Sequence, residues 1–308
     1  MNDQRRTILK GMTAMAAAGV SGIATAKSGY DPKAKFELKV SKVPFRKNAK
    51  GRQLMARIYQ PVGTGPFPVV LDLHGGAWQR KDRTAEEPMD RAIAASGVLV
   101  VAIDMTLSGE APYPACIQDA SYGIRWLKVR AKEWKGDALT LGLYGSSSGG
   151  HVAEMLMLRP NDARYNAIPL EGEAKTDTSV AYVATRSPIS DTFARWEQAV
   201  RKPNENLQKA SKMFFNPWET IHEGNPLEIL ERKEKVGMRP LLIMQGALDD
   251  NVLPAAQEKF VRTFKAAGGD VTFKIFENSV HEWVAEPGPQ TTAAQEMVKA
   301  FIAKQLSV

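Results

Sequence analysis

Six short, strongly apolar runs constrain the fold of this chain more than any other feature. Each run is four to six residues long and rich in Val, Leu and Ile. Runs of this kind are typical of strands that are covered on both faces, as in a parallel sheet. They lie at residues 69–73, 98–103, 139–144, 180–184, 241–244 and 271–276. We therefore expect a buried, mostly parallel sheet.

Helical periods separate these runs. Apolar residues recur at helix spacing in residues 117–127 and again in residues 294–302. Strands that alternate with helices predict an α/β fold in which helices cover both faces of the central sheet. Before the first run, residues 36–40 and 54–59 alternate apolar and polar side chains, which is the pattern of half-buried antiparallel strands.

The stretch from residue 190 to residue 235 breaks this rhythm. It is longer than an ordinary connection between elements. Its aromatic residues are Phe193, Trp196, Phe214, Phe215 and Trp218. We predict a helical cap inserted at about 190–235 into one domain that spans residues 27–308.

The N-terminus reads as an export signal. Arg5 and Arg6 precede a small-residue apolar run at 11–24, and Ala24-Thr25-Ala26 supplies a small-x-small cleavage pattern. We predict a twin-arginine-type signal peptide at 1–26 and a periplasmic or secreted mature chain. The apolar run is shorter than the roughly 20 residues of a bilayer span, so we expect no stable membrane span. The alternative is an amphipathic first helix of a cytoplasmic protein.

Charge and composition exclude several classes of function. The formal net charge is +7, but Lys and Arg are dispersed among acidic residues, so we expect no nucleic-acid partner. Cys116 is the single cysteine of the sequence, which excludes an intramolecular disulfide and a Cys-based metal site. The four histidines show no ligand spacing. We expect no metal and no cofactor.

A glycine-rich turn carries the first chemical motif. The apolar run that ends at Tyr144 leads into Gly145-Ser146-Ser147-Ser148-Gly149, and an apolar helical segment follows. This is Gly-x-Ser-x-Gly in a strand, turn and helix, a setting that exposes a nucleophilic hydroxyl on a tight turn. Of the three serines, Ser147 alone has glycine two residues before and two after it. The alternative is a Gly/Ser-rich turn without chemistry.

A second glycine pair follows the apolar run at 69–73, in His74-Gly75-Gly76-Ala77-Trp78. Glycines let backbone N–H groups approach a developing negative charge closely. We expect an oxyanion hole built from the N–H groups of Gly75, Gly76 and Ser148, with Ala77 as a further candidate. His74 is expected to brace the loop.

A nucleophilic serine needs a base and an acid that orients the base. Asp249 follows the run at 241–244, and His281 follows the run at 271–276. We predict these two as the acid and the base. Asp250 and Asp191 are the other candidates for the acid, since each stands near the end of a predicted strand.

Together these motifs resemble those of the α/β-hydrolase esterases related to the hormone-sensitive-lipase and acetyl-esterase groups. The resemblance covers residues 74–281 and includes the chain order Ser, Asp, His. The Ala-Trp that ends the second motif is similar to a branch containing arylformamidases and feruloyl-esterase-like enzymes. The family often has Asp and Ala where this chain has Ser146 and Ser148. The resemblance implies an α/β-hydrolase fold and a small-molecule carboxylic ester as substrate.

Two other classes of function remain beside the esterase. One is an amidase, such as an arylformamidase, or a small peptidase with the same three residues. The other is a hydrolase fold that binds without catalysis. For the substrate pocket we predict Trp78, Trp196 and Phe214, with simple packing as the alternative role of each aromatic ring.

Overall fold

The computed structural model describes residues 29–173 and 175–307, so the predicted signal peptide at 1–26 lies outside the described residues. Within them, one eight-stranded sheet has the order β1-β2-β4-β3-β5-β6-β7-β8. β2 pairs antiparallel with β1 and with β4, and every other pairing is parallel. The strands are β1 (Leu38–Lys47), β2 (Gln53–Pro61), β3 (Val69–Leu73), β4 (Leu99–Ile103), β5 (Gly142–Ser146), β6 (Val183–Arg186), β7 (Leu241–Gly246) and β8 (Val271–Phe276).

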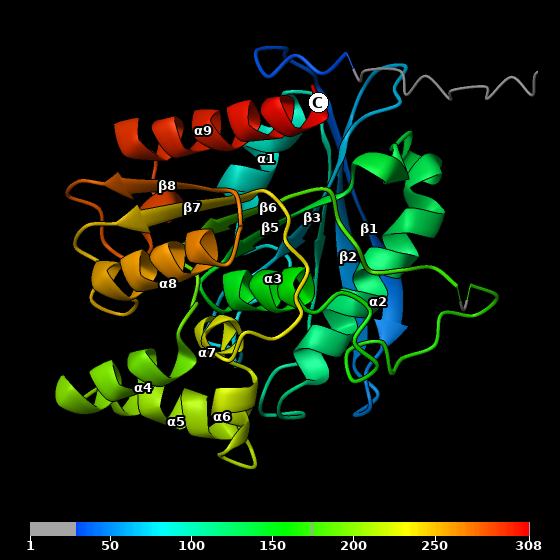
Figure 1. The fold of residues 1–308 in the computed structure, drawn as a ribbon. Helices are drawn as coiled ribbons and strands as arrows, with labels where there is room; N and C mark the ends of the chain where they lie inside the picture. Colours follow the sequence, from blue (N-terminus) through cyan, green and yellow to red (C-terminus); the bar gives the residue numbers. More distant parts are fainter. Residues whose placement is uncertain (1–28, 174, 308) are drawn as a thin grey trace, which may run out of the picture.

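Helices cover both faces of this sheet. α1 and α9 pack together on one face, and α2, α3 and α8 lie on the other (Figure 1). Successive residues of a strand point to opposite faces, so Leu71 joins the core under α2 and α3 while Val70 joins the core under α1 and α9. The predicted α/β-hydrolase architecture is confirmed. These helices are α1 (Glu87–Ala95), α2 (Ala115–Arg130), α3 (Ser148–Leu158), α8 (Pro254–Ala266) and α9 (Pro289–Leu306).

Several strand boundaries differ from the expectation, and the antiparallel strand expected at 36–40 is β1, which runs from Leu38 to Lys47. The run at 139–144 was expected to be extended throughout, but residues 138–140 form a 3-10 turn and β5 begins at Gly142. Asp137 starts that turn by accepting a hydrogen bond from the Leu139 N–H at 3.0 Å, and Leu139 is 89% exposed. A polar cap therefore overrides the apolar pattern. β6 likewise begins at Val183 and continues to Arg186.

Four helices occupy the segment predicted as a cap. They are α4 (Thr192–Arg201), α5 (Glu205–Phe214), α6 (Thr220–Glu223) and α7 (Pro226–Glu231). Asp191, Asn204 and Asn225 each accept a backbone N–H from the first turn of the helix that follows, so short polar residues fix three of the four helix starts. α4, α5 and α6 lie together at the end of the molecule remote from α9 (Figure 1).

A helix that crosses a membrane must be both long and apolar. In residues 29–173 and 175–307, no helix combines the length and the apolar composition that crossing a membrane requires.

Candidate active site

Ser147 occupies a strained turn between β5 and α3. Its φ of 51° and ψ of −116° lie outside the regions that side chains prefer. The neighbouring glycines explain how the turn closes. A Cβ at Gly149 would lie 1.9 Å from the Leu73 carbonyl oxygen, and one at Gly145 would lie 2.6 Å from the Gly149 carbonyl oxygen. The sequence pattern Gly-x-Ser-x-Gly is thus a packing requirement, and strain at such a turn is typical of functional sites.

The structure brings Ser147, His281 and Asp249 together. Nε2 of His281 lies 2.9 Å from Oγ of Ser147, and Nδ1 lies 2.7 Å from Oδ2 of Asp249. The three residues follow β5, β8 and β7, and the parallel strands from β5 to β8 are consecutive in the sheet. Their carboxyl ends therefore share one edge, where sites in open α/β sheets are found. This geometry suits a proton transfer from the serine hydroxyl to the imidazole.

Asp249 is held by its own loop. Its side chain is completely buried, and Oδ1 accepts the backbone N–H groups of Asn251 at 3.0 Å and Val252 at 2.8 Å. Oδ2 also accepts a hydrogen bond from the Gln245 side-chain amide at 3.0 Å. Burial alone would raise the pKa of Asp249, but the hydrogen bond and charge of His281, with the Val252 N–H, outweigh it and hold the pKa below its usual range. The carboxylate is therefore ionised at neutral pH.

The other two acid candidates lie elsewhere. Asp250 is exposed and forms an ion pair with Lys202 at 2.7 Å. Asp191 accepts the Ala194 N–H at 3.0 Å as the cap of α4 and a second hydrogen bond from the Asn225 amide at 3.0 Å. Only Asp249 of the three contacts the imidazole of His281.

The loop after β3 lies directly against the Ser147 turn. A Cβ at Gly75 would lie 3.4 Å from the Ser147 Cβ, and one at Gly76 would lie 2.0 Å from the Arg80 carbonyl oxygen. Gly76 also has a φ of 110°, a conformation that favours glycine. Gly76 is therefore required by close backbone approach, and a Cβ at Gly75 would crowd the Ser146 carbonyl oxygen at 3.1 Å.

The same loop presents free backbone donors. Within residues 29–173 and 175–307, the N–H groups of Gly75, Gly76, Ala77 and Ser148 donate to no protein acceptor. The Ser148 N–H also belongs to the first turn of α3, where the helix dipole favours negative charge. Oγ of Ser148 accepts the Trp78 N–H at 3.2 Å and so ties the loop to the helix.

The predicted aromatic residues pack against other aromatic rings, and Trp78 and Phe214 are buried while Trp196 is partly buried. Trp78 stacks on Phe214 with ring centroids 4.5 Å apart, and its Nε1–H donates to Nδ1 of His151 at 3.2 Å. Trp196 packs against Trp218, with ring centroids 5.0 Å apart. Neither Trp196 nor Phe214 lines the pocket that contains His281. The packing alternative accounts for these two rings, because apolar rings in the insertion bury each other.

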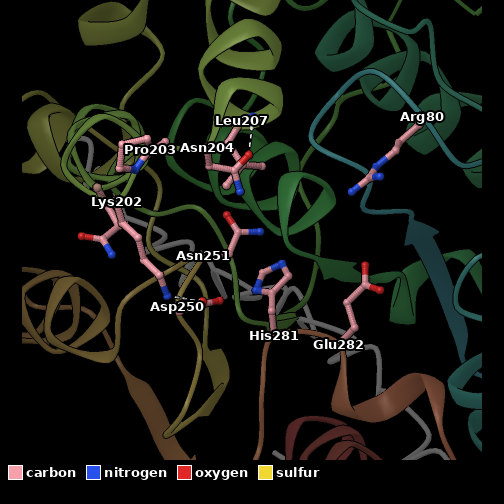
Figure 2. A pocket seen from close by; sticks show the side chains of 11 residues that line it. Arg80, Lys202, Pro203, Asn204, Leu207, Asp250, Asn251, His281 and Glu282 are labelled. Atoms are coloured by element: carbon pink, nitrogen blue, oxygen red, sulfur yellow. Dashed lines mark hydrogen bonds and ion pairs between the residues drawn. The ribbon is translucent and has the colours of Figure 1, made fainter.

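A polar pocket of about 350 Å³ opens beside His281. Figure 2 shows the His281 ring at its centre, with Asn251 beside it and the Arg80 side chain extending toward it from the opposite side. The insertion forms one wall through residues of α4, α5 and their connection, namely Gln198, Ala199, Lys202, Pro203, Asn204 and Leu207. Asp250 and Glu282 complete the lining. The insertion thus contributes to the pocket, but its lining side chains are not aromatic and were not predicted from the sequence.

The pocket has no arrangement suited to a metal. Across the part of the chain that the structure describes, no three His, Cys, Asp or Glu side chains are placed so that they could hold an ion.

Two buried charged residues near the Ser147 turn, Glu86 and Arg186, were not predicted from the sequence. Arg186 had a visible signal, since it is a charged residue that ends an otherwise apolar strand.

Comparison with known proteins shows that the sequence is similar to two mycobacterial esterases. Carboxylesterase NlhH of Mycobacterium tuberculosis is 35% identical over 102 residues, which are 32% of this chain and 32% of that protein. Esterase LipC of Mycobacterium tuberculosis is 25% identical over 250 residues, 78% of this chain and 59% of that protein. The chain thus spans about a third and about three fifths of the lengths of these two relatives.

The solved structures agree with the fold. An inhibited esterase B from Lactobacillus rhamnosis superposes with a TM-score of 0.72 at 18% identity, covering 89% of this chain and 90% of that chain. The BD-FAE family model matches residues 57–264, a range that contains Ser147 and Asp249 and ends before His281. Since that match covers more than half of the sequence, the chain belongs to the BD-FAE family.

Proposed function

We propose that this protein is a serine hydrolase that cleaves small-molecule carboxylic esters through an acyl-enzyme. The observation that carries the proposal is the unbroken chain of hydrogen bonds from Ser147 through His281 to Asp249, at 2.9 Å and 2.7 Å. The names of the relatives, a carboxylesterase and an esterase, support the choice of ester as substrate.

The first half of the reaction forms the acyl-enzyme. Oγ of Ser147 attacks the ester carbonyl carbon while Nε2 of His281 accepts the hydroxyl proton. The C–O bond to the alcohol then breaks, and the imidazolium returns the proton to the departing alkoxide. Asp249 holds the tautomer with hydrogen on Nδ1 and stabilises the imidazolium that forms.

The second half repeats these steps with water. His281 takes a proton from the water as the water oxygen attacks the acyl carbon. The bond between that carbon and Oγ of Ser147 then breaks, His281 returns the proton to Oγ, and the carboxylic acid is released. In both halves the carbonyl oxygen carries negative charge in the tetrahedral intermediate. The free N–H groups of Gly75, Gly76 and Ser148 would stabilise that charge, each by about 3 kcal/mol.

The pocket supports a small substrate. A volume of about 350 Å³ falls within the range of small-molecule sites. Its lining holds more polar and charged side chains than apolar ones, so an ester with polar substituents would be bound more favourably than one with a long alkyl chain.

A paired assay separates the ester from the amide. The purified chain is given p-nitrophenyl acetate and p-nitrophenyl butyrate in parallel with the matching p-nitroanilides, and the release of nitrophenol or nitroaniline is followed by absorbance. We expect the ester kcat/KM to exceed the anilide value by at least about a hundredfold, because the amide has the poorer leaving group. Faster anilide cleavage would make the protein an amidase, and absence of both reactions would favour a binding module.

We also propose that residues 1–26 direct export by the twin-arginine route, on the basis of their sequence. Replacing Arg5 and Arg6 together by Lys keeps the positive charge and removes the paired arginines that the receptor reads. The precursor should then accumulate in the cytoplasm, as measured by immunoblots of cell fractions. An unchanged periplasmic fraction would contradict the proposal.

A further inference from the structure

A buried ion pair lies beneath the proposed nucleophile turn. Arg186, at the end of β6, and Glu86, just before α1, have side chains that are 4% and 5% exposed. Nη2 of Arg186 lies 3.4 Å from both carboxylate oxygens of Glu86. The two residues are 100 positions apart in the chain, so only the folded sheet brings them together.

The ion pair is hydrogen-bonded to the backbone of His281 and to Ser146, the neighbour of Ser147. Nη1 of Arg186 donates a hydrogen bond to the backbone carbonyl of His281 at 2.6 Å. Glu86 accepts a hydrogen bond from the hydroxyl of Ser146, the residue directly before the nucleophile. The Ser146 side chain is completely buried, so this carboxylate is its partner in the interior.

The guanidinium also contacts the chain beyond His281. Its central carbon lies 5.7 Å from the centroid of the Trp283 ring, which is buried. Arg186 thus holds the loop after β8 at the carbonyl of His281 and again two residues later. A planar guanidinium with five donors can bind two acceptors in fixed directions, and an ammonium cannot reproduce that fork.

Two further carboxyl groups, Asp72 and Asp90, are completely buried and lie within the electrostatic influence of Glu86. Burial raises the pKa of Asp72, and burial together with the charge of Asp72 raises the pKa of Asp90. Both groups therefore tend to hold protons. The pairing of Arg186 with Glu86 rests on geometry, since Nη2 of Arg186 lies 3.4 Å from both oxygens of that side chain.

We infer that Glu86 and Arg186 form a positioning unit that fixes the backbone of His281 relative to Ser147, so that Nε2 stays within hydrogen-bond reach of Oγ. This inference rests on the proposed function and adds two residues to it. The unit touches neither substrate nor reacting atoms. Disruption of the Glu86–Arg186 pair should therefore lower kcat, because kcat depends on the alignment of Nε2 of His281 with Oγ of Ser147. KM should stay nearly unchanged.

The alternative is a buried pair that only supports the fold. Breaking such a pair lowers stability because it leaves one charge buried without a partner. Arg159 offers a matched control. Its side chain is 10% exposed and pairs with Glu223 at 2.9 Å and Glu234 at 2.7 Å, and it stands at the opposite end of α3 from Ser147.

The experiment compares Arg186→Lys, Arg186→Met and Arg159→Met with the wild-type chain. For each we would measure thermal unfolding by circular dichroism, and kcat and KM on p-nitrophenyl acetate below the unfolding range. Arg186→Lys keeps a positive charge opposite Glu86 and should stay folded with kcat about tenfold lower and KM unchanged. Arg186→Met should lower kcat further if it folds. Arg159→Met should lower the unfolding temperature and keep kcat.

A second readout does not depend on turnover. The Nδ1 proton of His281, shared with Asp249, should give a far-downfield proton resonance that is assigned by its loss in His281→Gln. We expect this resonance to shift or broaden in Arg186→Lys and to be unchanged in Arg159→Met. If Arg186→Lys kept both the wild-type kcat and the wild-type resonance, the inference would be overturned. A wild-type chain without esterase activity but with a resonance that responds to Arg186→Lys would refute the proposed function alone.

Discussion

Ser147→Ala should abolish ester hydrolysis and leave the fold intact. Oγ is the attacking atom, so its removal is expected to lower kcat on the order of 10⁶-fold, the loss typical when a triad nucleophile is deleted. Alanine fits the turn because its Cβ occupies the position of the serine Cβ, and no helix cap is lost with the hydroxyl. The measurement is turnover of p-nitrophenyl acetate, with the unfolding temperature measured on the same sample.

Ser148→Ala is the matched control for this variant. It keeps the backbone N–H that the oxyanion hole needs and loses only the contact between Oγ and the Trp78 N–H. We expect its kcat within about tenfold of wild type, since one neutral hydrogen bond contributes roughly 1 kcal/mol. Wild-type turnover by Ser147→Ala would refute the nucleophile assignment.

Asp249→Asn should lower turnover by about three to four orders of magnitude. An asparagine amide can donate toward Nδ1, and this favours the tautomer in which Nε2 carries the hydrogen and cannot accept the serine proton. The buried position makes the effect large, because solvent cannot replace the lost acceptor. The measurement is kcat/KM at neutral pH for the variant and for wild type.

Asp250→Asn and Asp191→Asn are the controls, with the same chemical change at neighbouring carboxylates. Asp250 is exposed and pairs with Lys202, so its loss should change kcat/KM by less than about threefold. Asp191→Asn leaves a residue that still caps α4 well. If Asp250→Asn instead lowered kcat/KM by several orders of magnitude, Asp250 would be the acid and the assignment of the loop after β7 would be wrong by one residue.

The sequence predicted the sheet and the Ser147, Asp249 and His281 arrangement because both depend on local signals. An apolar run between helical periods is a property of a few adjacent residues. Gly145 and Gly149 are dictated by backbone contacts that no larger residue permits. The acid and the base are then limited to polar residues that follow the next strands along the chain.

The pocket wall and the buried pair escaped prediction for a common reason. Which charged side chains meet across the sheet depends on distant segments, such as Glu86 and Arg186. The start of β5 was missed because a capped 3-10 turn replaced an extended run. The flanking glycines distinguished Ser147 in the sequence, but they gave no role to its two serine neighbours. The structure gives Ser146 a buried carboxylate partner and Ser148 a contact with the loop after β3.

The position of His281 after the outermost parallel strand has a consequence for how the proposed activity would be lost on heating. Among the residues that the structure describes, β8 is an edge strand that pairs only with β7, and His281 stands 134 positions after Ser147. Edge elements open in local fluctuations that cost less free energy than global unfolding. Opening of β8 would carry His281 away from Ser147 while β3 to β7 remain paired. We therefore expect inactivation on heating to begin with a subglobal opening that leaves most of the sheet intact.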